Sequence, residues 1–67
     1  PSITFQTVSV AGQQGLKKEI IGIDKSEVYV FIPVKERIYV IHAFGEPSAY
    51  TQNSSAIQKL IDSITFL

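Results

Sequence analysis

The chain has 67 residues, six basic against six acidic side chains, and no cysteine, methionine or tryptophan. The zero net charge argues against nucleic acid as a partner, no apolar run approaches the roughly 18 residues that span a bilayer, and no disulfide can reinforce the core. A chain of about 60 residues buries only about 60% of its unfolded surface, so residues 1–67 are expected to be one small domain or the C-terminal half of a larger domain. Charged residues make up 18% of the chain, below the ~25% usual for soluble domains, which favours association.

The first third of the chain predicts two strands joined by a turn. Residues 2–10 are rich in β-branched side chains, but the apolar positions change phase half-way along, which predicts a bent strand with a bulge near Gln6-Thr7. Residues 11–15 contain two glycines and indicate a turn. Residues 16–23 mix helix-favouring lysines with strand-favouring isoleucines, and we interpret them as a strand.

The middle of the chain predicts a β-hairpin. Asp24-Lys25-Ser26 supplies turn residues, and Glu27 to Val34 and Arg37 to Phe44 are apolar, β-branched and aromatic segments on either side of Lys35-Glu36. These two segments are the clearest strands in the sequence.

The last third of the chain predicts a helix. Gly45 to Ser48 ends the sheet, and Asn53-Ser54-Ser55 marks a helix start, where Ser55 and Gln58 have the spacing of a capping box. From there the apolar positions repeat with the helical period: Ile57, Leu60, Ile61 and Ile64. The predicted fold is therefore α+β, a four-stranded antiparallel meander followed by one C-terminal helix packed on one face.

Both faces of the predicted hairpin are apolar, and one short helix covers only one of them. The other face is expected to be covered by a second copy of the chain in a homo-oligomer, by a missing N-terminal half, or by another protein. If the hairpin pairs Val34 with Ile38, the possible interaction face contains Tyr29, Phe31, Tyr39 and Ile41. A one-residue change in the turn would re-sort the second strand.

No catalytic chemistry is evident in the sequence. His42 is the only histidine and no cysteine is present, so a zinc site lacks ligands. The acidic residues sit mostly at turn edges and are not expected to converge on His42, and no serine stands in a nucleophile motif. We therefore predict a non-enzymatic protein with no catalytic residue, no cofactor and no metal.

One motif leaves an alternative function open. Gly12-Gln-Gln-Gly15, followed by residues 16–21, is similar to the GxxG loop and helix with which KH domains clamp nucleic acid. A hairpin turn is the favoured interpretation, because Lys18 stands where such a helix needs an apolar residue and Gly22 interrupts it. The alternative is a small nucleic-acid or ligand-binding domain that uses the Gly12–Gly15 loop.

The end of the chain supports a family resemblance. Residues 57–66, Ile-Gln-Lys-Leu-Ile-Asp-Ser-Ile-Thr-Phe, follow the pattern of the closing helix and tail of PsbP-like domains and related bacterial lipoproteins, except that Ile57 and Ile64 replace aromatic residues usual there. The segments before it, residues 15–17, 28–34 and 37–41, are similar to the preceding hairpin of that family.

This resemblance covers the chain from about Val8 onward and corresponds to the second half of such a domain. It implies a non-enzymatic, often extracytoplasmic binding or assembly module of the cell envelope. In that family a preceding N-terminal half supplies more sheet and another helix, which would cover the second face of the sheet.

Overall fold

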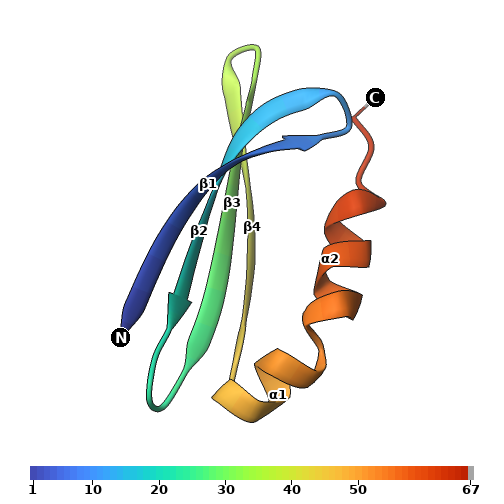
Figure 1. Ribbon diagram of the computed structural model, residues 1–67. Helices are drawn as coiled ribbons and strands as arrows, with labels where there is room; N and C mark the ends of the chain where they lie inside the picture. Colours follow the sequence, from blue (N-terminus) through green and yellow to red (C-terminus); the bar gives the residue numbers. More distant parts are fainter. Residues whose placement is uncertain (67) are drawn as a thin grey trace.

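The computed structural model describes residues 1–66 and contains one antiparallel sheet with two helices. The sheet order is β1-β2-β3-β4, and the helices lie on one face of the sheet (Figure 1). This confirms the predicted antiparallel meander. The bounds are β1 Ser2–Val10, β2 Gln13–Ile21, β3 Ser26–Val34, β4 Arg37–Gly45, α1 Pro47–Gln52 and α2 Ser54–Asp62.

The prediction of a single C-terminal helix is wrong, because the chain forms two short helices that meet at Asn53. Pro47 opens α1, as suits the first helical position, where no hydrogen-bonded N–H is needed. The backbone N–H and the side-chain amide of Asn53 both donate to the carbonyl oxygen of Ala49, at 3.0 and 2.8 Å. This pair of bonds closes α1 and turns the chain before α2 begins.

The predicted capping box at the start of the helix does not form. α2 begins at Ser54, one residue before the predicted cap, and has no side-chain cap hydrogen bond. The Ser54 hydroxyl donates backwards to the Thr51 carbonyl oxygen at 2.9 Å, and the Gln58 amide donates to Asp62 Oδ1 at 3.0 Å. The Ser54 side chain therefore bonds across the junction of the two helices, and the Gln58 side chain bonds within α2, so neither caps the first turn of α2.

Tight turns set the register of the two outer hairpins. Ala11 and Gly12 join β1 to β2 with φ of 52° and 79°, and positive φ at both central residues is the type I′ pattern that suits the twist of a hairpin. Between β3 and β4, Val34 pairs with Arg37 across Lys35-Glu36, and Lys35 has a φ of 58°. The register that pairs Val34 with Ile38, on which the predicted interaction face depends, does not form, and the structure has the alternative that is shifted by one residue.

That one-residue difference re-sorts all of β4, because side chains alternate between the faces of a strand. Tyr39 and Ile41 pair with Ile32 and Val30, so they lie on the face that the helices cover. Alternate residues of β4 lie on the opposite face, beside Tyr29, Phe31 and Pro33: Ile38, Val40, His42 and Phe44.

The bulge predicted in β1 is also wrong, since β1 and β2 pair without interruption from Ser2↔Ile21 to Val10↔Gln13. The change of apolar phase has another cause. The first half of β1 places its apolar side chains on the face away from the helices, and the second half places Val8 and Val10 on the helix side. In Figure 1 the second half of β1 bends towards the helices.

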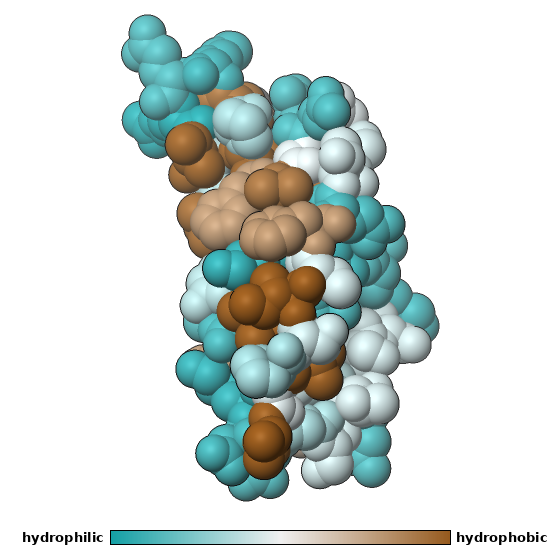
Figure 2. Space-filling view, turned by 60° about the vertical axis from the view of Figure 1, so that its left-hand side comes forward, coloured by the Kyte–Doolittle hydropathy of each residue, from teal (hydrophilic) through white to brown (hydrophobic). Residues whose placement is uncertain are grey.

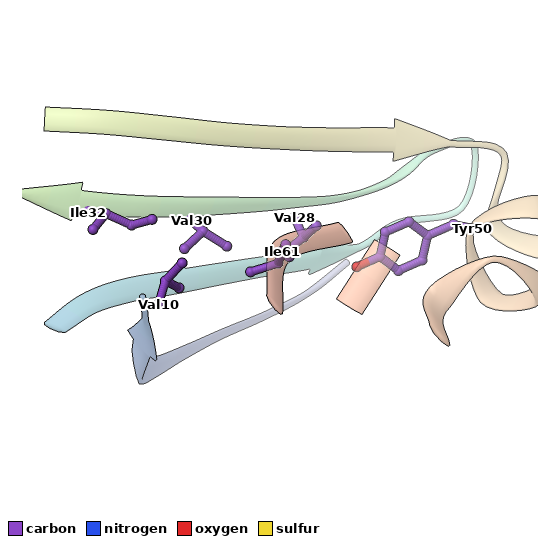
Figure 3. Packing of buried hydrophobic residues seen from close by; sticks show 6 residues of the cluster. All are labelled: Val10, Val28, Val30, Ile32, Tyr50 and Ile61. Carbon is purple, nitrogen blue, oxygen red and sulfur yellow. The ribbon is translucent and has the colours of Figure 1, made fainter. Parts of the chain in front are cut away.

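The hydrophobic core lies between the sheet and the helices. The side chains of Val28, Val30 and Ile32 project from one side of β3 towards Val10 of β1 and Ile61 of α2 (Figure 3). Tyr50 of α1 closes the core at the other end, and its hydroxyl donates a 2.5 Å hydrogen bond to Glu19 Oε2. Burial and this hydrogen bond raise the pKa of Tyr50, so the phenol stays protonated.

The predicted apolar stripe of the helix is confirmed at Ile57, Ile61 and Ile64, which pack on the core, but not at Leu60. Leu60 is 67% exposed, whereas Ile61 is only 4% exposed. The apolar stripe that α2 packs against the sheet is therefore narrower than the stripe predicted from the sequence.

We expect Ile61→Ala to lower the free energy of unfolding by about 2 to 5 kcal/mol, because it removes a buried side chain and leaves a cavity. Leu60→Ala is the matched control and should change it by less than about 0.5 kcal/mol, since exposed substitutions cost little. Urea denaturation at a fixed protein concentration measures both. Equal losses for the two variants would contradict the packing of α2 described here.

We expect Tyr50→Phe to cost about 1 to 2 kcal/mol at neutral pH, because it removes a hydrogen bond to a carboxylate and keeps the ring. Tyr39→Phe is the control, since the Tyr39 ring packs on Phe66 at 5.0 Å and its side chain is 41% exposed. Urea denaturation of both variants tests this. A Tyr50 variant as stable as the Tyr39 variant would show that the bond to Glu19 does not anchor α1.

Candidate functional site

The face of the sheet away from the helices is the candidate site, and we call it the open face. Cross-strand partners share a face, so the register aligns its side chains in rows across the four strands. Figure 2 shows apolar atoms in a band along this face, bordered by more hydrophilic ones. The first row is Ile3, Ile20, Glu27 and Phe44; the middle row is Phe5, Lys18, Tyr29 and His42; the third row is Thr7, Leu16, Phe31 and Val40.

The open face is apolar and largely exposed. Its large exposed side chains come from three of the four strands, and β3 contributes the half-buried rings of Tyr29 and Phe31. A shallow hollow at one end is lined by Leu16, Phe31 and Pro33 among others. The exposed members are Ile3, Phe5, Leu16, Ile38, Val40 and Phe44.

Two of the four residues predicted for the interaction face lie on the open face, and two do not. Tyr29 and Phe31 are part of it, whereas Tyr39 and Ile41 lie on the helix side, where Tyr39 packs on Phe66 and Ile41 on the core. The change follows from the two-residue turn between β3 and β4. Sequence reasoning missed His42, Phe44 and Val40 for the same reason.

Aromatic rings form a continuous ladder across β3 and β4. The ring of Tyr29 stacks on His42 with centroids 4.0 Å apart and lies 5.9 Å from the ring of Phe31. Phe44 meets His42 edge-on at 5.0 Å. Because Tyr29 and His42 pack face to face, these two rings turn edges rather than free faces towards solvent.

Glu27 is the polar centre of the ladder. Its side chain is 11% exposed, its Oε1 lies 2.9 Å from His42 Nε2, and its Oε2 lies 3.5 Å from Lys25 Nζ. The nearby Tyr29 hydroxyl, followed by His42 and Lys25, lowers the pKa of the Glu27 carboxyl. The Glu27 carboxylate in turn raises the pKa of Tyr29. The carboxylate is therefore held ionised against an apolar surface.

The convergence of Glu27 on His42 contradicts the expectation that the acids stay apart from the histidine. Glu27 pairs with Phe44 and His42 pairs with Tyr29, so the two side chains are diagonal neighbours on one face. The signal for this contact is the length of the loop at Lys35-Glu36. A two-residue loop pairs Val34 with Arg37, and that register places Glu27 and His42 on one face.

The pair offers a carboxylate and an imidazole, the parts of a general base, but its other neighbours are the rings of Tyr29 and Phe44. Within residues 1–66 no group of three or more His, Asp or Glu side chains is arranged to hold a metal ion. No helix in that part of the chain is long and apolar enough to cross a membrane. The geometry thus describes a polar contact inside an apolar surface.

Lys18 lies in the middle row as a single cation among apolar neighbours. Its ammonium stands over the ring of Phe5 at 5.8 Å from the centroid, a cation–π contact. Among the described residues no carboxylate lies within 4.0 Å of it, since both salt bridges there belong to Glu27. The open face therefore presents one positive charge without a negative partner.

The Gly12–Gly15 segment forms a turn and the start of a strand, as the favoured interpretation expected. Gly12 is the second turn residue, and Gly15 lies in β2 so close to β3 that a Cβ there would stand 2.6 Å from the Phe31 carbonyl oxygen. Lys17 and Lys18 are consecutive strand residues and point to opposite faces. The loop followed by a basic helix on which the alternative function rests does not form.

Comparisons with protein-family models, curated proteins and solved structures give no match for this chain. The functional argument therefore rests on the open face itself.

We expect the pH dependence of stability to identify the Glu27 contacts. A carboxyl whose folded pKa is lowered stabilises the fold above its unfolded value, here 4.5, and this stabilisation is lost as the pH falls through the lower folded value. Between about pH 5 and pH 3, the wild type should therefore lose more stability than Glu27→Gln, which has no carboxylate to protonate.

Urea denaturation at several pH values and a fixed protein concentration measures this difference. Glu36→Gln, in the β3–β4 turn, is the control and should follow the wild-type curve. Parallel curves for wild type and Glu27→Gln would mean that the Tyr29 and His42 contacts do not stabilise the folded state.

Proposed function

We propose that this chain is a non-enzymatic interaction or assembly module that packs its open face against protein. One observation carries the proposal: the helices cover one side of a four-stranded sheet whose other side exposes Phe5, Val40 and Phe44 at 53 to 63%. Contiguous apolar patches beyond a few hundred Å² mark interaction sites on soluble proteins. Sheets with two apolar faces are ordinarily covered on both.

The ring geometry favours protein over nucleic acid as the occupant. Bases bind by stacking on free aromatic faces beside a basic groove. Here Tyr29 and His42 use their faces on each other, and the chain has no net charge. Ring edges and branched aliphatic side chains are instead suited to the interdigitated packing of protein interfaces.

The relationship to PsbP-like domains forms part of this proposal. The order of elements, an antiparallel meander followed by C-terminal helices, supports it. In such a domain another segment of the same polypeptide would lie on the open face, and the chain would act by assembly rather than by catalysis.

Site-specific photo-crosslinking in the cells that make the natural protein tests the proposal. A photo-reactive phenylalanine analogue replaces Phe5 on the open face, or Leu60 on α2 as the control, because these side chains are 63% and 67% exposed. We expect the probe at position 5 to form a covalent adduct with a polypeptide, either another molecule or another segment of the same one.

The probe at position 60 should give only background labelling. An absence of polypeptide adducts at position 5, or equal labelling at both positions, would contradict the proposal. Mass spectrometry of the adduct identifies the occupant.

A further inference from the structure

We infer that the occupant of the open face is a second copy of this chain, packed face to face about a twofold axis parallel to the strands. This inference rests on the proposed function and adds the partner and its orientation. Three features of the open face carry it: its area, its charge and the positions of Lys18 and Glu27.

The open face has the area that a small symmetric dimer needs. Four strands about 4.8 Å apart and four rows of side chains about 7 Å apart, the fourth row being that of Pro33 and Ile38, give roughly 500 Å² in projection, and the relief of the side chains adds to this. Specific interfaces bury about 800 Å² per partner, and weaker ones less than about 600 Å². One copy of the open face therefore has about the area of one partner's share in a small, weak interface.

The open face carries one cation, Lys18, and one anion, Glu27, so its charges suit a second copy better than a strongly acidic or basic partner. The chain carries six basic and six acidic side chains, so two copies do not repel each other at long range. On the open face Lys18 lacks a carboxylate, and Glu27 holds an ionised carboxylate that can accept more hydrogen bonds than His42 and Lys25 supply. Glu27 of the same chain is the diagonal neighbour of Lys18 but forms no ion pair with it within 4.0 Å, so Glu27 of a second copy can supply the anion from the opposite sheet.

A twofold axis parallel to the strands, between β2 and β3, brings Lys18 of each copy near Glu27 of the other and so forms two equivalent contacts. It places β2 of each copy over β3 of the other, and β1 over β4. Lys18 and Tyr29 share the middle row, so Lys18 then lies over Tyr29 of the other copy, one row from its Glu27. Two sheets packed about 10 Å apart with strands aligned within about 30° bring these long side chains within reach.

The same axis pairs apolar with apolar. Ile3 of β1 lies over Phe44 of the other copy, and Phe5 lies over His42, between the neighbouring rows that carry Phe44 and Val40. An axis across the strands through the middle row would instead bring the two Lys18 ammonium groups together, which costs free energy in an apolar interface. The charge pattern thus favours the axis parallel to the strands over an axis across them through the middle row.

A charge-exchange experiment tests both the partner and the axis. Lys18→Glu places two carboxylates opposite each other at both contacts, so sedimentation should show the dissociation constant raised at least about tenfold. Glu27→Lys should weaken its own homodimer in the same way. An equimolar mixture restores opposite charges at both contacts, and we expect heterodimers with a dissociation constant within about threefold of wild type.

Lys59→Glu on α2 is the control, because it makes the same charge change on the exposed side of a helix and should leave the dimer unchanged. Circular dichroism checks folding. If Glu27→Lys does not fold, Glu27→Gln replaces it. A mixture of the Glu27→Gln and Lys18→Glu chains has one attractive and one neutral contact. The dissociation constant of this heterodimer should be at least about threefold lower than that of the Lys18→Glu homodimer.

A wild-type chain that sediments as a monomer at micromolar concentration would overturn the inference. So would an equimolar mixture of the two charge variants that does not regain the affinity of the wild-type dimer. The proposed function would survive both results if the probe at position 5 labels a different protein or another segment of the same polypeptide. Dimers insensitive to Lys18→Glu would indicate pairing of the edge strands β1 or β4 instead of the open face.

Discussion

The pairing of Val34 with Arg37 across a two-residue turn is the constraint on which the rest of the molecule depends. It places Ile41 and Ala43 under the helices beside Val28 and Val30, where they join the core. A turn one residue longer would bring His42 into that layer and expose Ile41. The imidazole would then need a buried hydrogen-bond partner, and Glu27 would be on the other side of the sheet.

The elements that depend on local sequence could be predicted, and those that depend on register could not. Alternating β-branched residues and the Ala11-Gly12 turn indicate strands and a hairpin whatever they pack against. The break between α1 and α2 depends on Asn53, whose backbone N–H and side-chain amide both donate to the Ala49 carbonyl oxygen. The contact between Glu27 and His42, 15 residues apart, depends on the length of the loop between their strands, which the apolar pattern of either strand alone does not fix.

The small core makes the open face relevant to stability as well as to the proposed binding. Among residues 1–66 six hydrophobic residues are buried, and α2 contributes one of them, Ile61. A domain of this size has little apolar burial to offset the conformational entropy lost on folding. Covering Phe5 and Phe44 would add apolar burial, so association and folding are expected to be coupled: whatever occupies the open face also stabilises the sheet.

The polar groups of the open face give this apolar surface an orientation. An unbroken sheet of Ile, Val and Phe would pack on many partners and in several directions, because hydrophobic attraction has no preferred direction. Lys18 and the Glu27–His42 pair must each keep a polar partner when the face is covered, since a buried unpaired charge costs several kcal/mol. Only a surface that presents an anion near Lys18 and leaves the Glu27 contacts intact meets both conditions. The charges therefore exclude most apolar surfaces, and the proposed twofold arrangement would satisfy them because it brings Glu27 of each copy near Lys18 of the other.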